Sequence, residues 1–304
     1  MAGLSGFLSR LRPADSVTII FLVFLNALTI VFFREVPKAP LLIGLYSTLI
    51  IAQLTLIRFR NRNHFLRIFY SIVFPIACVL IIFDSLGQLV HYINPTDIDP
   101  LLIRMDYMIF HGHPTVMLEK IASPLLTDML QLAYTSYYFI PISFGIILFR
   151  NNLTRDFDRS VFLILLCFYL SYLGYILFPA LGPRFYLNNL QTAELQGLLI
   201  SEPIQSILNR LEGIKRDAFP SGHTAITVLV LCLAYRYKRD FFWIALPIVS
   251  ALIFATVYCR YHYVVDVIAG LALTLPTLVL GKIYYAWWEK RQTDINPGQK
   301  RGLR

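Results

Sequence analysis

Apolar residues form eight runs along the chain, separated by short polar segments. Most runs are about 16 to 21 residues long, and a helix needs about 20 to cross the hydrocarbon core of a bilayer. Because lipid satisfies no backbone hydrogen bonds, runs of this kind fold as helices. The sequence therefore predicts an all-α integral membrane protein with about eight transmembrane helices. The predicted spans are 16–33, 40–57, 68–93, 129–149, 161–181, 222–235, 241–258 and 263–288.

An amphipathic segment precedes the first span. Leu4, Phe7 and Leu8 recur at helical spacing beside Arg10, which is typical of an N-terminal interfacial helix. No repeat or flexible linker divides the chain, so we expect one membrane domain over 1–304. Its expected parts are the interfacial helix with three spans (1–93), an extracytoplasmic loop (94–128), a catalytic core (129–289) and a cytoplasmic tail (290–304).

The composition agrees with this pattern, and the positions of the basic residues explain the net positive charge. Hydrophobic residues make up 57% and charged residues 15%, against about 25% charged in soluble proteins. The net charge of +9 does not indicate nucleic acid binding, because 17 of the 27 basic residues lie in the short loops and termini of one side. Basic loops are cytoplasmic. We expect a multi-pass protein of the plasma or inner membrane, or of the Golgi or ER in a eukaryote, with both termini cytoplasmic.

The most informative polar segment is Pro-Ser-Gly-His, residues 220–223, at the start of the sixth span. Pro and Gly with Ser221 suit a helix start, where Ser221 caps the first turn. Free backbone N–H groups at such an end bind anions. Ser221 and Gly222 are therefore predicted to contact an anionic group beside His223.

A second polar segment opens the last span. His262 and Asp266 are four residues apart and share a helix face. Asp266 is expected to hold one imidazole nitrogen and leave the other free to attack, as in a nucleophile with its orienting partner. Between His223 and His262 the chain is long enough to cross the membrane and return. We therefore expect both histidines at the same extracytoplasmic or lumenal face.

Arginines at that face complete the predicted site. Arg184 follows Gly182 and Pro183 at the outer end of the fifth span, and Arg260 precedes His262. Guanidinium groups suit phosphate oxygens through paired donors. Together His223, His262 and Asp266, the arginines Arg184 and Arg260, and the helix start at Ser221 and Gly222 describe a site for a phosphoryl group.

The 220–223 segment with His262 and Asp266 resembles the second and third motifs of the type 2 phosphatidic acid phosphatase superfamily, membrane enzymes that act on lipid phosphates. The resemblance covers roughly residues 128–290. It implies a six-helix phosphatase-type core, a phosphohistidine intermediate, no metal and no other cofactor. It also implies that His262 is the nucleophile, Asp266 its orienter and His223 the acid that protonates the leaving oxygen. The substrate would be a lipid phosphate taken from the bilayer.

Some positions depart from the phosphatase branch. In that branch a Lys lies before the first-motif Arg and a Pro lies after it, whereas here these positions are Leu177 and Phe185. The third motif of that branch begins with Ser-Arg, and here those positions are Ala255 and Thr256. Arg260 would then supply the third-motif guanidinium from a different backbone position.

These departures resemble the inositol phosphorylceramide synthase-like branch and its bacterial relatives, which transfer a head group between lipids. The segment 104–114 and Tyr134, Tyr137 and Tyr138 are similar to that branch as well. The acceptor therefore stays open: water would make the protein a lipid phosphatase, and a small polyol such as inositol a phosphotransferase.

Other interpretations of the same residues also stay open. The His and Asp residues could form a buried polar cluster that joins helices, or ligate iron or zinc. An anionic-substrate transporter is an alternative of another class, although the sequence lacks the inverted repeats and broken helices typical of transporters. Arg184 and Arg260 could simply pair with lipid phosphates at the interface.

Overall fold

The structure is a computed structural model that describes residues 11–198, 203–204 and 216–295. The described residues are helical and contain no strand, which confirms the predicted all-α fold. The interfacial helix predicted around Leu4 to Leu8 and residues 296–304 of the predicted tail lie outside this range.

Among the described residues, seven helices or continuous helical runs are long and apolar enough to cross a membrane. The sixth predicted span is α14 (Gly222–Tyr237), which has 16 residues and lies among the other helices. The chain is therefore a multi-pass membrane protein. The seven are α2 (Pro13–Val31), α3 (Ala39–Phe59), α4–η1–α5 (His64–Leu86), α9–η3–α10 (Pro124–Arg150), α11 (Thr154–Leu177), α15 (Arg239–Tyr258) and α16 (Val264–Ile295).

Proline and glycine set several helix ends that the hydropathy pattern did not place. The third span ends at Leu86, before Gly87, and a separate turn, α6 (Val90–Ile93), follows it. α11 ends at Leu177 rather than at residue 181, because Pro179 disfavours helix in the residue before it. The fourth span begins at Pro124, which fits the first turn of α9 (Pro124–Thr135), and a 3₁₀ turn, η3 (Ser136–Tyr138), joins it to α10 (Phe139–Arg150).

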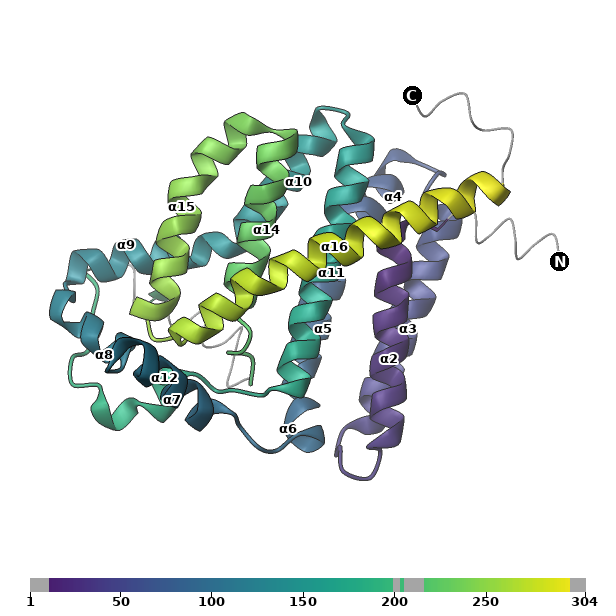
Figure 1. Cartoon of the computed structure of the whole chain (residues 1–304). Helices are drawn as coiled ribbons and strands as arrows, with labels where there is room; N and C mark the ends of the chain where they lie inside the picture. The colour runs from purple at the N-terminus through teal and green to yellow at the C-terminus, as the bar shows by residue number, and fades with distance from the viewer. Residues whose placement is uncertain (1–10, 199–202, 205–215, 296–304) are drawn as a thin grey trace.

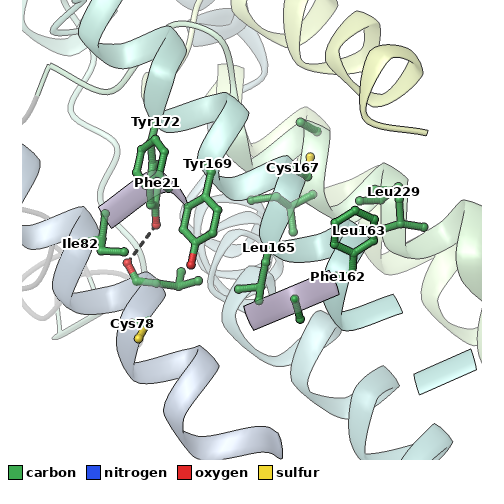
Figure 2. Close-up of a cluster of buried hydrophobic side chains, with 14 of the residues drawn as sticks. Phe21, Cys78, Ile82, Phe162, Leu163, Leu165, Cys167, Tyr169, Tyr172 and Leu229 are labelled. Atoms are coloured by element: carbon green, nitrogen blue, oxygen red, sulfur yellow. Dashed lines mark hydrogen bonds between the residues drawn. The ribbon is translucent and has the colours of Figure 1, made fainter. Parts of the chain in front are cut away.

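α11 is the central helix of the bundle. It packs against α2, α5 (Phe74–Leu86), α10, α14 and α16, and α16 crosses obliquely in front of it (Figure 1). Figure 2 shows part of this core: Tyr169 of α11 stacks on Phe21 of α2, and the Tyr172 hydroxyl donates to the Val79 carbonyl of α5 at 3.1 Å. Since lipid is as apolar as these side chains, close packing and such hydrogen bonds hold the helices together.

One end of the bundle carries a buried charged network. Arg12 donates to Asp158 of α11 at 3.1 Å and to the Tyr70 hydroxyl at 2.9 Å, and Tyr70 in turn donates to Asp15. The network ties the start of α2 to α11 and to η1 (Phe69–Val73). Arg155 pairs with Glu289 of α16 at the same end.

The opposite end carries the long connections and short helices. These are α7 (Asp99–Phe110), α8 (Pro114–Met117), η2 (Leu118–Ile121), α12 (Pro183–Tyr186) and η4 (Asn188–Leu190), and the picture places α7, α8 and α12 together there (Figure 1). α7 packs on α12 and on the first turns of α16. The starts of α14 and α16 meet at this end, which positions the residues that the motifs single out.

Candidate active site

The two histidines face each other, as their spacing predicts. His223 lies in the first turn of α14, and His262 lies two residues before the start of α16. The His262 Nε2 atom is 3.4 Å from His223 Nδ1. His262 is 3% exposed. Two buried imidazoles that face each other can give a proton to, or take one from, a group that is bound between or beside them.

His223 is held by aromatic rings. Its ring stacks on Tyr134 at 4.5 Å between centroids and lies 4.1 Å from the ring of Tyr137. Tyr134 also stacks on Tyr261, next to His262. These contacts fix the plane of the His223 ring, and its buried Nε2 has no hydrogen-bond partner among the described residues.

Two acceptors share the second nitrogen of His262. Its Nδ1 lies 2.8 Å from the Ala218 carbonyl oxygen and 3.5 Å from Oδ2 of Asp266. A proton on Nδ1 leaves Nε2 with a free lone pair, which is the tautomer that a nucleophile needs. Asp266 also accepts from the Tyr263 backbone N–H at 2.8 Å. The orientation of His262 therefore depends on Ala218 as well as on Asp266, and the sequence did not indicate Ala218.

Ser221 caps α14, as predicted. Its Oγ accepts from the backbone N–H of Thr224 at 3.3 Å, and its own N–H donates to the Asp266 carbonyl at 3.0 Å. Gly222 packs directly against the hydroxyl of Tyr175, where a Cβ would not fit. Both residues are buried, and neither lines the cavity described below. A role for Ser221 and Gly222 in binding phosphate stays a prediction.

Arg184 lies in the first turn of α12, beside the cavity. Its guanidinium is 5.4 Å from the ring centre of Tyr261, and its backbone N–H donates to the Arg260 carbonyl at 3.2 Å. Gly182 makes this approach possible: its φ is +96°, and a Cβ there would lie 2.8 Å from the Tyr261 carbonyl oxygen. Arg184 thus lies beside Tyr261, the neighbour of His262, and lines the same cavity as both histidines.

Arg260 lies elsewhere. Its φ is +63°, and its guanidinium pairs with Glu119 at 2.8 Å and donates to the Ala193 carbonyl at 2.6 Å. The residue does not line the cavity. The structure thus brings Arg184 to the histidines and directs the side chain of Arg260 into the connecting loops.

Two aspartates of α7 organise the site, and neither was predicted to belong to it. Asp99 accepts from the backbone N–H groups of Leu181 and Gly182, both at 2.8 Å, and from the Tyr263 hydroxyl at 2.9 Å. Asp106 accepts from the Val264 and Val265 N–H groups at 3.0 and 2.9 Å, which caps α16. Burial raises the pKa of both carboxyl groups. The only signal in the sequence was the segment around Asp106, interpreted as a mark of one branch of the family.

A cavity of about 590 Å³ opens beside the histidines. His223, His262, Arg184 and Asp217 line its polar end, and the rest of its wall is mainly apolar. Within the part of the chain that the structure describes, no three His, Cys, Asp or Glu side chains are grouped to hold a metal ion. The arrangement places two imidazoles and a guanidinium in the wall of a mainly apolar cavity, which suits a phosphate ester with a hydrophobic tail.

A helical multi-pass membrane protein with a histidine pair at one end of its bundle is the class that these observations define. The chain belongs to the PAP2 superfamily, which residues 101–280 match. It is also 28% identical over 186 residues to a PA-phosphatase related-family protein of Dictyostelium discoideum, a match that covers 55% of this chain and 34% of that relative. No solved structure matches.

Proposed function

We propose that the protein cleaves a lipid phosphoester through a phosphohistidine intermediate on His262, at the extracytoplasmic face of the membrane. The observation that carries the proposal is the approach of His262 Nε2 to His223 Nδ1, 3.4 Å apart, at the polar end of a mainly apolar cavity. A membrane phosphatase needs this combination, because its substrate has a charged reacting group and a tail that stays in hydrocarbon.

The first step transfers the phosphoryl group to the enzyme. The Nε2 lone pair of His262 attacks phosphorus, the P–N bond forms, and the P–O bond to the lipid breaks. His223 gives its proton to the leaving lipid oxygen, a contribution typically worth 10² to 10⁴-fold in rate. Arg184 neutralises charge on the phosphoryl oxygens, and positioned charges of this kind supply most of the catalysis in phosphoryl transfer.

The second step releases the phosphoryl group to an acceptor. His223, now neutral, takes the proton of the acceptor hydroxyl, whose oxygen attacks phosphorus while the P–N bond breaks. With water the products are inorganic phosphate and the dephosphorylated lipid. With a polyol such as inositol the product is a new phosphoester, as in the head-group transferase branch. The proposed chemistry uses side chains alone, without a metal or other cofactor.

Purified protein in phospholipid vesicles tests the proposal. With a radiolabelled lipid phosphate we expect release of inorganic phosphate and, after a rapid quench, an acid-labile label on the protein. His262→Gln should lose the label and at least a thousandfold of the activity, given what removal of a nucleophile costs. His64→Gln, an exposed histidine at the opposite end, is the matched control. A parallel reaction with inositol shows whether the polyol competes with water.

Two results would overturn the proposal. One is a His262→Gln variant that keeps more than about a thousandth of the parent activity. The other is a parent protein that releases no phosphate and forms no new lipid, but moves an anionic solute across the vesicle membrane, which would favour the transporter.

A further inference from the structure

The cavity continues from the histidines far along the bundle. On α11 its wall runs from Tyr175, level with His223, to Phe157 in the first turn of the helix. Eighteen residues of helix correspond to about 27 Å. This length exceeds one leaflet, since the whole hydrocarbon core is about 30 Å thick. The cavity therefore extends through the bundle well past the middle of the membrane.

The length of the cavity fits one long hydrocarbon chain. A carbon–carbon bond of about 1.5 Å advances an extended chain by about 1.25 Å, so the cavity holds about 20 carbons.

The cavity has an opening toward the bilayer. α5 and α10 both pack against α11, whereas no comparable packing joins α5 to α10. Leu80 of α5 and Ile146 of α10 line the cavity and are 50% and 39% exposed. A lipid can therefore enter sideways between these two helices. α5 lies outside the superfamily match of residues 101–280, so the N-terminal part of the chain supplies one wall.

We infer that this groove between α5, α10 and α11 binds an extended chain of about 16 to 20 carbons, belonging to the lipid whose phosphate lies at the histidines. The inference rests on the proposed function for the position of the phosphate. Because lipid is as apolar as the groove, selection between chains depends on shape and length rather than on transfer out of water.

Gly145 of α10 offers a direct test. It lines the groove, and an added Cβ there meets only Phe157, at an ordinary 3.8 Å. Tyr137 contacts His223, and Gly145 lies eight residues further along, about 12 Å. An 8-carbon chain reaches about 10 Å and stops short of it, while an 18-carbon chain passes it. The leucine of Gly145→Leu would fill the groove below the head of the substrate and leave the phosphate site intact.

The experiment compares single-chain lipid phosphates of 8 and 18 carbons in detergent micelles. For Gly145→Leu we expect kcat/KM for the 18-carbon substrate to fall at least fivefold, the lower range of what overfilling costs. The value for the 8-carbon substrate should stay within twofold. Gly44→Leu is the matched control, because Gly44 lies on α3 with nothing within 4 Å of an added Cβ. Equal losses on both substrates, or none on the longer one, would overturn the inference.

A second measurement does not depend on turnover. An 18-carbon lipid phosphate with a photoreactive group on its last carbon should label the first turns of α11 or η1, near Phe157 and Ser71. Labelling near Tyr134 and Tyr138 instead would show that the chain does not run along the groove. A parent protein that hydrolyses neither substrate would contradict the proposed function, and the labelling would still decide where the chain lies.

Discussion

The carboxylate of Asp99 accepts a hydrogen bond from the backbone N–H of Gly182, with 2.8 Å between oxygen and nitrogen. The contact joins α7 to the turn that precedes Arg184, across 83 residues of sequence. The same carboxylate also accepts a hydrogen bond from the hydroxyl of Tyr263, the residue that follows His262. One buried side chain thus holds the arginine turn and the start of α16 together, and the relative position of Arg184 and His262 depends on it.

Asp99→Asn should therefore weaken activity without any contact with substrate. The new NH₂ group would face a backbone N–H donor, and an unmet buried hydrogen bond costs about 1 to 3 kcal/mol. We expect kcat/KM on a lipid phosphate to fall at least tenfold and the thermal midpoint to fall as well. Asp240→Asn, exposed at the far end of the bundle, is the control. Unchanged kinetics in Asp99→Asn would show that the turn keeps its geometry without the carboxylate.

Asp106 gives a prediction about pH. Burial raises the pKa of its carboxyl group above the ordinary value of about 3.9, so the folded state binds this proton more tightly than the unfolded state. Its contribution to stability is present at low pH and is lost as the pH rises through the raised pKa. Asp106→Asn removes this titration. Thermal midpoints of parent and variant should therefore differ more at pH 4 than at pH 7; the opposite trend would mean that the two backbone hydrogen bonds outweigh burial.

Asp266→Asn should be milder than loss of His262. In a catalytic triad, loss of the orienting carboxylate costs about 10⁴-fold because the histidine adopts the wrong tautomer. Here the Ala218 carbonyl, 2.8 Å from Nδ1, still selects the proton position. We expect a drop of about 10 to 100-fold in kcat, the range typical of a supporting partner. Initial rates on one lipid phosphate, measured beside His262→Gln, test this; an equally inactive Asp266→Asn would contradict it.

The two arginines should differ in their effect on phosphate binding. Arg260 is paired with Glu119, and both side chains are nearly buried, whereas Arg184 lies beside the histidines. Arg184→Gln should raise the inhibition constant of inorganic phosphate at least tenfold. Arg260→Gln should change this constant less than threefold but lower the thermal midpoint, because the nearly buried Glu119 loses its cation and keeps only hydrogen bonds from Thr192 and Ala193. Adding Glu119→Gln should recover part of that stability. A large phosphate effect in Arg260→Gln would restore the prediction made from the sequence.

The sequence predicted the helical membrane fold and the meeting of His223 with His262, because both depend on features that are local in the chain. Hydropathy marks the helices, and the number of residues between the two motifs returns the chain to the same end. It did not predict the roles of Asp99 and Asp106, because their partners lie 82 to 164 residues away. Arg260 shows the same limit, since neither its partner Glu119 nor its left-handed backbone can be read from neighbouring residues.

The basic residues predict an orientation in the membrane, and this prediction has a simple test. Asn152-Leu153-Thr154 is a glycosylation sequon between α10 and α11, at the end opposite the histidines. Leu190→Thr places a second sequon at Asn188, an exposed residue at the histidine end. If the basic end is cytoplasmic, expression with eukaryotic microsomes should glycosylate Asn188 and leave Asn152 unmodified. Because both sites lie in one polypeptide, each is the control for the other. A glycan on Asn152 would reverse the orientation and turn the histidines toward the cytoplasm.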